Sequence, residues 1–87
     1  MSTFQRSPRA IWRASSGFLV AAVPPNPPTR MAGSAAAVWH ALAELVSLDE
    51  LVERLAVDAG ATAPQIRADV QLLLDALVPL GLVEVRR

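Results

Sequence analysis

The hydrophobic residues between positions 66 and 77 repeat with the period of an α-helix, and they cover more of its circumference than a surface helix needs. At about 100° per residue, one face of this helix carries a stripe of five apolar side chains: Ile66, Val70, Leu73, Leu74 and Leu77. Leu72 and Ala76 widen the apolar arc beyond that stripe, and Asp69 lies inside the widened arc. Such a helix is either wedged into the core on two sides or keeps one side for a partner.

Short apolar runs separated by turn residues predict strands in the first third of the chain. Ala10–Ala14 and Phe18–Val23 flank the cluster Ser15-Ser16-Gly17, which is typical of a β-hairpin. The proline-rich residues 24–28 exclude a helix or a central strand and predict a stiff connector. Thr29–Ala32 follows as a third short strand, and its proline neighbours suit the edge of a sheet.

Helical periodicity and capping residues predict the next two elements. Ser34 is a suitable N-cap for a first helix over Ala35–Leu45. Ser47 and Glu50 have the spacing of a capping box, which opens a second helix over about Leu48–Ala59, with a glycine at its C-terminal end.

A second capping box, Thr62 with Gln65, opens the third helix, which contains the wide apolar arc and runs to about Val78. Leu82–Val85 then returns as an extended tail. The order of elements predicts an α+β fold in which a three-stranded sheet is followed by three helices.

The length and composition place these elements in one domain. The chain has 87 residues, and we expect a flexible arm over residues 1–9 and a folded domain over residues 10–87, with Trp39 and Leu51 in its core. No apolar run approaches the roughly 20 residues of a membrane span, so no membrane partner is expected. The first residues carry no apolar core of a secretory signal, and cysteine is absent. The simplest location is therefore cytoplasmic.

The charges are segregated along the chain although the net charge is zero. Residues 1–43 carry four arginines, Arg6, Arg9, Arg13 and Arg30, and no acidic residue, whereas residues 44–87 carry all eight acids and four arginines. The two halves therefore bear +4 and −4. Either the halves pair internally, or one positive face attracts an acidic ligand.

Residues with catalytic or metal-binding chemistry are scarce. His40 is the one histidine, and general acid–base catalysis needs an oriented partner for it. There is no second histidine or cysteine for a zinc site and no glycine-rich phosphate loop. We therefore expect no enzymatic activity, no metal and no cofactor.

The second and third helices with the tail also have the order found in winged-helix DNA-binding proteins, so a transcription regulator is the alternative function. The helix that would read DNA exposes Gln65, Arg67, Gln71 and Asp75, with Asp69 nearby. One arginine among two acids is a poor match to a phosphate backbone, and the preceding helix is acidic as well. No nucleic-acid partner is therefore expected.

Three stretches together resemble the PqqD-like family, whose domains are the recognition elements of ribosomally synthesised and post-translationally modified peptides (RiPPs). They are residues 33–42 (GSAAAVWHAL), residues 47–55 (SLDELVERL) and residues 66–83 (IRADVQLLLDALVPLGLV). The resemblance extends over about residues 10–85, and the proline-rich connector departs from the family's shorter one. It implies a winged helix–turn–helix-like domain with an antiparallel sheet.

The resemblance also implies a function as a non-catalytic peptide chaperone. Such a domain binds the leader of a precursor peptide as an added β-strand and presents it to a maturation enzyme, a leader peptidase or a radical-SAM enzyme, in a lasso-peptide or radical-SAM pathway. The peptide-binding residues it implies lie on the third strand and the third helix: Thr29, Arg30, Met31, Ala32, Ile66, Arg67, Asp69, Val70, Leu73 and Leu77. The two arginines would either meet leader acids or be solvated, and the aspartate would pair with Arg30 or Arg13 or cap a strand end.

We expect weak, salt-sensitive and non-specific DNA binding at most, because the third helix carries too few positive charges. A gel shift at physiological salt, with duplexes from the DNA around the gene, measures this. Sequence-selective binding below micromolar concentration would contradict the expectation and favour the winged-helix regulator.

Overall fold

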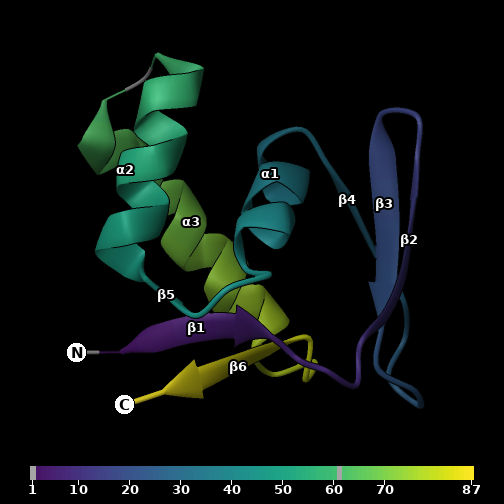
Figure 1. Cartoon of the computed structure of the whole chain (residues 1–87). Helices are drawn as coiled ribbons and strands as arrows, with labels where there is room; N and C mark the ends of the chain where they lie inside the picture. Colours follow the sequence, from purple (N-terminus) through teal and green to yellow (C-terminus); the bar gives the residue numbers. More distant parts are fainter. Residues whose placement is uncertain (1, 61) are drawn as a thin grey trace.

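The computed structural model describes residues 2–60 and 62–87 and places two small sheets beside three helices (Figure 1). The strands are β1 (Thr3–Arg6), β2 (Ile11–Ser15), β3 (Phe18–Ala22), β4 (Thr29–Ala32), β5 (Val46–Ser47) and β6 (Val83–Arg86). The helices are α1 (Ser34–Ala41), α2 (Leu48–Ala59) and α3 (Ala63–Leu77). The predicted α+β fold, a three-stranded antiparallel sheet followed by three helices, is confirmed.

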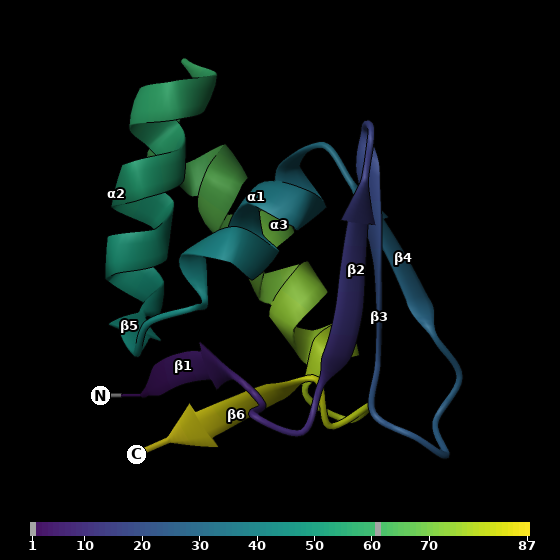
Figure 2. The same ribbon diagram turned by 45° about the vertical axis from the view of Figure 1, so that its right-hand side comes forward.

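The sheet predicted from the sequence has the strand order β2-β3-β4, with both pairs antiparallel. The hairpin loop is Ser16-Gly17, and Gly17 has a φ of 82°, which a glycine adopts without steric cost. All three helices lie on one side of this sheet, and no helix or strand of residues 2–60 and 62–87 covers its other face (Figures 1 and 2).

A second sheet, in the order β5-β1-β6, includes a strand where a loose arm was predicted, whereas the predicted extended tail forms its strand β6. Phe4 pairs with Val46 on one side and with Val85 on the other, and its side chain is buried. The partners of β1 come from more than 40 positions away in the sequence. Apart from Met1, residues 1–9 contain a single large apolar side chain, so no local pattern could indicate this strand.

The first helix is shorter than predicted, and its capping differs. It begins at Ser34, with Gly33 rather than Ser34 at the N-cap, and no side chain caps it. It ends at Ala41, because the chain leaves the helix to bury Val46 in β5 beside β1. Leu45, predicted to be helical and apolar, is therefore a largely exposed loop residue.

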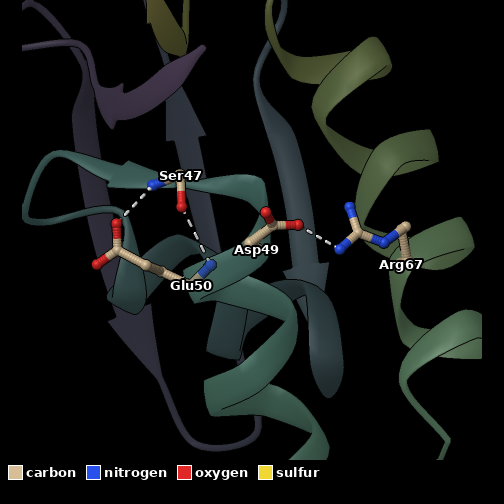
Figure 3. A network of polar contacts seen from close by, with 4 residues as sticks. All are labelled: Ser47, Asp49, Glu50 and Arg67. Carbon is tan, nitrogen blue, oxygen red and sulfur yellow. Dashed lines mark hydrogen bonds and ion pairs between the residues drawn. The ribbon is translucent and has the colours of Figure 1, made fainter. Parts of the chain in front are cut away.

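One predicted capping box is confirmed and the other is wrong. Ser47 accepts a hydrogen bond from the backbone N–H of Glu50, and the Glu50 carboxylate accepts one from the backbone N–H of Ser47 (Figure 3). Gly60 ends α2 in a left-handed conformation, as predicted. At α3, by contrast, the Thr62 hydroxyl donates to the side chain of Gln65 and caps no backbone group.

The core lies between the β2–β3–β4 sheet and the helices. Trp39 of α1 and Leu51 of α2 are completely buried, as predicted. The ring of Trp12 meets that of Trp39 edge-on at a centroid distance of 6.1 Å. Trp39 therefore connects the helices to the sheet, and its buried indole N–H has no hydrogen-bond partner among the described residues.

Replacing Trp39 by alanine should lower the free energy of unfolding by about 3–5 kcal/mol, because it leaves a large cavity at this junction. Chemical denaturation followed by far-ultraviolet circular dichroism measures the loss. His40→Ala, at an exposed neighbour, is the control and should change stability by about 0.5 kcal/mol or less. A loss below about 1 kcal/mol for Trp39→Ala would show that Trp39 is not a core residue.

Candidate functional site

A mostly apolar groove of 720 Å³ lies between the beginning of α1 and the middle of α3. Its lining residues are Gly33, Ser34, Ala35, Ala37 and Val38 at the α1 end, Leu55 of α2, and Ile66, Asp69, Val70, Leu72 and Leu73 of α3. Asp69 is the one charged residue among them. Because Gly33 directly follows β4, the groove opens where the last strand of the β2–β3–β4 sheet ends.

The wide apolar arc of α3 is divided between the core and this groove. Val70, Leu74 and Leu77 are at most 3% exposed and pack in the core. Leu73 is half-buried, whereas Leu72 is 71% exposed, and both line the groove. One side of the helix is thus used by the fold, and the other side has no covering element among the described residues.

Strand β4 is an edge of its sheet, and the pairing register determines which backbone groups are free. A β-turn places a hydrogen bond between the residues that flank it, here Ser15 and Phe18. Hydrogen-bonded and non-hydrogen-bonded pairs alternate along antiparallel strands. The N–H and C=O groups of the next residue of β3 therefore point toward β4, where that residue pairs with Met31. Arg30 and Ala32 then direct their N–H and C=O groups away from β3, toward the open edge.

The four predicted residues of β4 lie at this edge but differ in their side chains. Met31 is buried in the core, and Thr29 is half-buried. Arg30 and Ala32 are exposed, and the Arg30 guanidinium lies 4.5 Å from the centre of the Phe18 ring. None of the four lines the groove, so β4 offers backbone groups rather than side-chain walls.

Of the six predicted residues of α3, the structure brings four to the groove: Ile66, Asp69, Val70 and Leu73. Leu77 lies in the core, 1% exposed. Arg67 does not line the groove and instead pairs with Asp49 of α2 (Figure 3). Asp69 lines the groove and makes no ion pair with Arg30 or Arg13 in the described part of the chain.

The predicted site did not include seven of the lining residues, which are Gly33, Ser34, Ala35, Ala37, Val38, Leu55 and Leu72. Leu72 had a signal, since it widens the arc outside the core stripe. The wall from α1 had only the small residues of its first turns, which let the groove come close to the backbone.

The described residues show no ion pair between the two oppositely charged halves of the chain. Among the described residues, the ion pairs are Arg54–Glu44, at 3.9 Å, and Arg67–Asp49, and all four partners come from the acidic half. Internal pairing, one of the two explanations for the segregated charges, is therefore not what the structure shows. Instead the Arg6 guanidinium lies 4.9 Å from the centre of the Trp12 ring and 5.5 Å from that of Trp39.

A family model described as coenzyme PQQ synthesis protein D (PqqD) matches residues 26–83. The chain belongs to the PqqD family. The matched residues include β4 and all three helices, and therefore every residue that lines the groove. The resemblance inferred from the sequence is confirmed.

A solved structure, "TbiB1 in Complex with the TbiA(beta) Leader Peptide", has a similar fold, with a TM-score of 0.82. The likeness covers 92% of this chain and 94% of the other at 17% sequence identity, which shows a shared fold. No curated protein matches the chain.

The described part of this PqqD-family chain contains no group of three or more acidic or histidine side chains that could hold a metal ion. His40 is exposed, and its ring lies 5.6 Å from that of Trp12. Within the same residues, no helix has the length and hydrophobicity needed to cross a membrane.

Proposed function

We propose that this chain binds the leader of a ribosomally synthesised precursor peptide as an additional strand on β4 and presents it to a maturation enzyme. The observation that carries the proposal is the position of the apolar groove, which opens at the end of a strand with a free edge. The backbone groups of Arg30 and Ala32 supply hydrogen bonds, and the side chains of α3 supply a wall.

The two components select different properties of the peptide. Hydrogen bonds to the edge of β4 require an extended backbone and no particular sequence. In an extended peptide, every second side chain points to the same face, at intervals of about 6.6 Å. Those side chains enter the groove against Val70, Leu72 and Leu73, so the leader carries apolar residues at alternate positions. A basic or polar side chain suits the position beside Asp69.

Two findings support the proposal besides the geometry. The chain belongs to the PqqD family, and its fold matches that of TbiB1, which was solved with a leader peptide bound. The chaperone is non-catalytic and cytoplasmic, needs no cofactor, and hands the leader to a leader peptidase or a radical-SAM enzyme in a lasso-peptide or radical-SAM pathway. The position of Arg67 weighs against the DNA-binding alternative, because this arginine of α3 is already paired with Asp49.

Leu72→Arg should weaken leader binding about thirtyfold or more, because a buried apolar anchor in such a groove contributes about 2–4 kcal/mol. Leu72 is 71% exposed, so its replacement leaves the core intact. Leu73→Arg tests the same wall at a position closer to the core. The measurement is fluorescence polarisation with a labelled synthetic leader of the precursor encoded beside this gene.

The matched control is Gln71→Arg, which adds the same charge to the same helix but lies outside the groove. It should bind the leader like the wild type. Equal binding by the wild type and both leucine variants, with unchanged circular dichroism, would place the leader elsewhere or show that none binds.

Arg30→Pro should reduce leader binding at least tenfold, whereas Arg30→Ala should reduce it much less. Both changes remove the guanidinium, but only proline removes the N–H that points to the open edge. An edge position tolerates proline, in contrast to Met31, whose N–H faces β3 and whose side chain is in the core. The same polarisation assay measures both. If the two variants bind alike, the peptide does not add as a strand on β4.

A further inference from the structure

The outer face of the β2–β3–β4 sheet, which points away from the helices, is apolar and basic. Met31 and its partner on β3 are buried, so the alternate positions of each strand point outward. These outward residues are Ile11, Arg13 and Ser15 on β2, Phe18, Val20 and Ala22 on β3, and Arg30 and Ala32 on β4. Each of them is exposed or half-buried, and Ile11 is 68% exposed.

The register places the two arginines of this face in one row. Arg13 pairs with Val20, and Val20 pairs with Arg30, so the two arginines flank a central valine, and the Arg30 guanidinium lies over the neighbouring Phe18 ring. Apolar side chains lie in the rows on either side of it, with Ile11 in one and Phe18 in the other. The face is therefore an apolar surface with a positive charge on its two margins.

No ion pair among the described residues neutralises this charge. Residues 1–43 contain no acidic residue, so no carboxylate belongs to this sheet. In the described part of the chain, neither Arg13 nor Arg30 takes part in an ion pair. The three outward residues of β2, Ile11, Arg13 and Ser15, are all exposed, and an exposed isoleucine in an uncovered sheet face is consistent with an interaction surface. An apolar face with unpaired arginines is complementary to an apolar surface that carries carboxylates.

We propose that this outer face, defined by the eight outward residues above, docks on an acidic, partly apolar surface of the enzyme that matures the peptide. The inference rests on the proposed leader binding for the identity of the partner. Strand β4 contributes to both surfaces, because its backbone edge is perpendicular to its outward side chains. A leader on the edge and an enzyme on the face therefore bind together, and the leader leaves the groove next to the enzyme.

Other occupants fit this face less well. Stable attraction to an anionic membrane takes a cluster of about four to eight basic residues, and this face offers two. A nucleic acid held by two arginines would bind weakly at physiological salt. A second copy of the chain would have to place its acidic α2 on the sheet, which makes a head-to-tail contact rather than a closed dimer.

The test measures binding of the purified maturation enzyme encoded beside this gene to the immobilised full chain by biolayer interferometry. Arg13→Glu should weaken binding at least tenfold, because it replaces an attraction with a repulsion. Ile11→Ser should weaken it several-fold and slow its association little, since it removes an apolar contact and no charge. Both side chains are exposed on β2, away from the edge of β4, so neither change should alter folding.

The matched control is Arg9→Glu, which makes the same charge change in the loop between β1 and β2, outside the outer face. It should retain enzyme binding within about twofold of the wild type. Wild-type association should also slow as salt is raised, because Arg13 and Arg30 are exposed.

Leader binding, measured on the same variants by polarisation, separates this inference from the proposed function. Loss of enzyme binding with normal leader binding supports the docking face. A wild type that binds the enzyme but no leader would contradict the proposed function and leave the docking result standing. The docking proposal is overturned if Arg13→Glu and Ile11→Ser bind the enzyme as the wild type does, if Arg9→Glu loses as much, or if the wild type binds no enzyme. It is also overturned if light scattering shows that the wild type self-associates through this face and the variants do not.

Discussion

Burial of one side of α3 is the constraint on which the candidate site depends. Val70, Leu74 and Leu77 are held in the core, so the rotation of the helix about its axis is fixed. That rotation turns Leu72 and Asp69 toward the groove and Arg67 toward α2. Ordering a mobile groove wall on binding would cost conformational entropy and so reduce the affinity for a ligand. This wall is already fixed by the same contacts that stabilise the fold.

Strand β4 relates the sheet to the groove. Its buried Met31 fixes the register, and the register determines which backbone groups are free at the edge and which side chains point outward. The chain then turns at Gly33 directly into α1, which forms the second wall of the groove. A short strand of four residues thereby contributes an edge for hydrogen bonding and part of an exposed face.

The charged residues of the two halves of the chain make different contacts in the structure. The arginines of the first half lie on aromatic rings or in solvent, with Arg6 beside Trp12 and Trp39 and Arg30 beside Phe18. Among the described residues, the acids of the second half that form ion pairs do so with arginines of the same half. The net charge of the molecule is therefore zero, but its positive and negative charges are separated. This separation favours oriented encounters with charged partners.

The sequence by itself determined the elements whose signals are local. The hairpin, the edge strand, the capping box of Ser47 and Glu50 and the helical period of α3 each depend on residues a few positions apart, and the structure has all of them. The resemblance to the PqqD family also came from the sequence. Tertiary structure decided what depends on distant partners: β1 and β6 form because each supplies the other's hydrogen bonds, and α1 ends early because Val46 is buried beside Phe4. It also divided the apolar arc of α3, since periodicity shows which residues share a face but not which neighbour covers them.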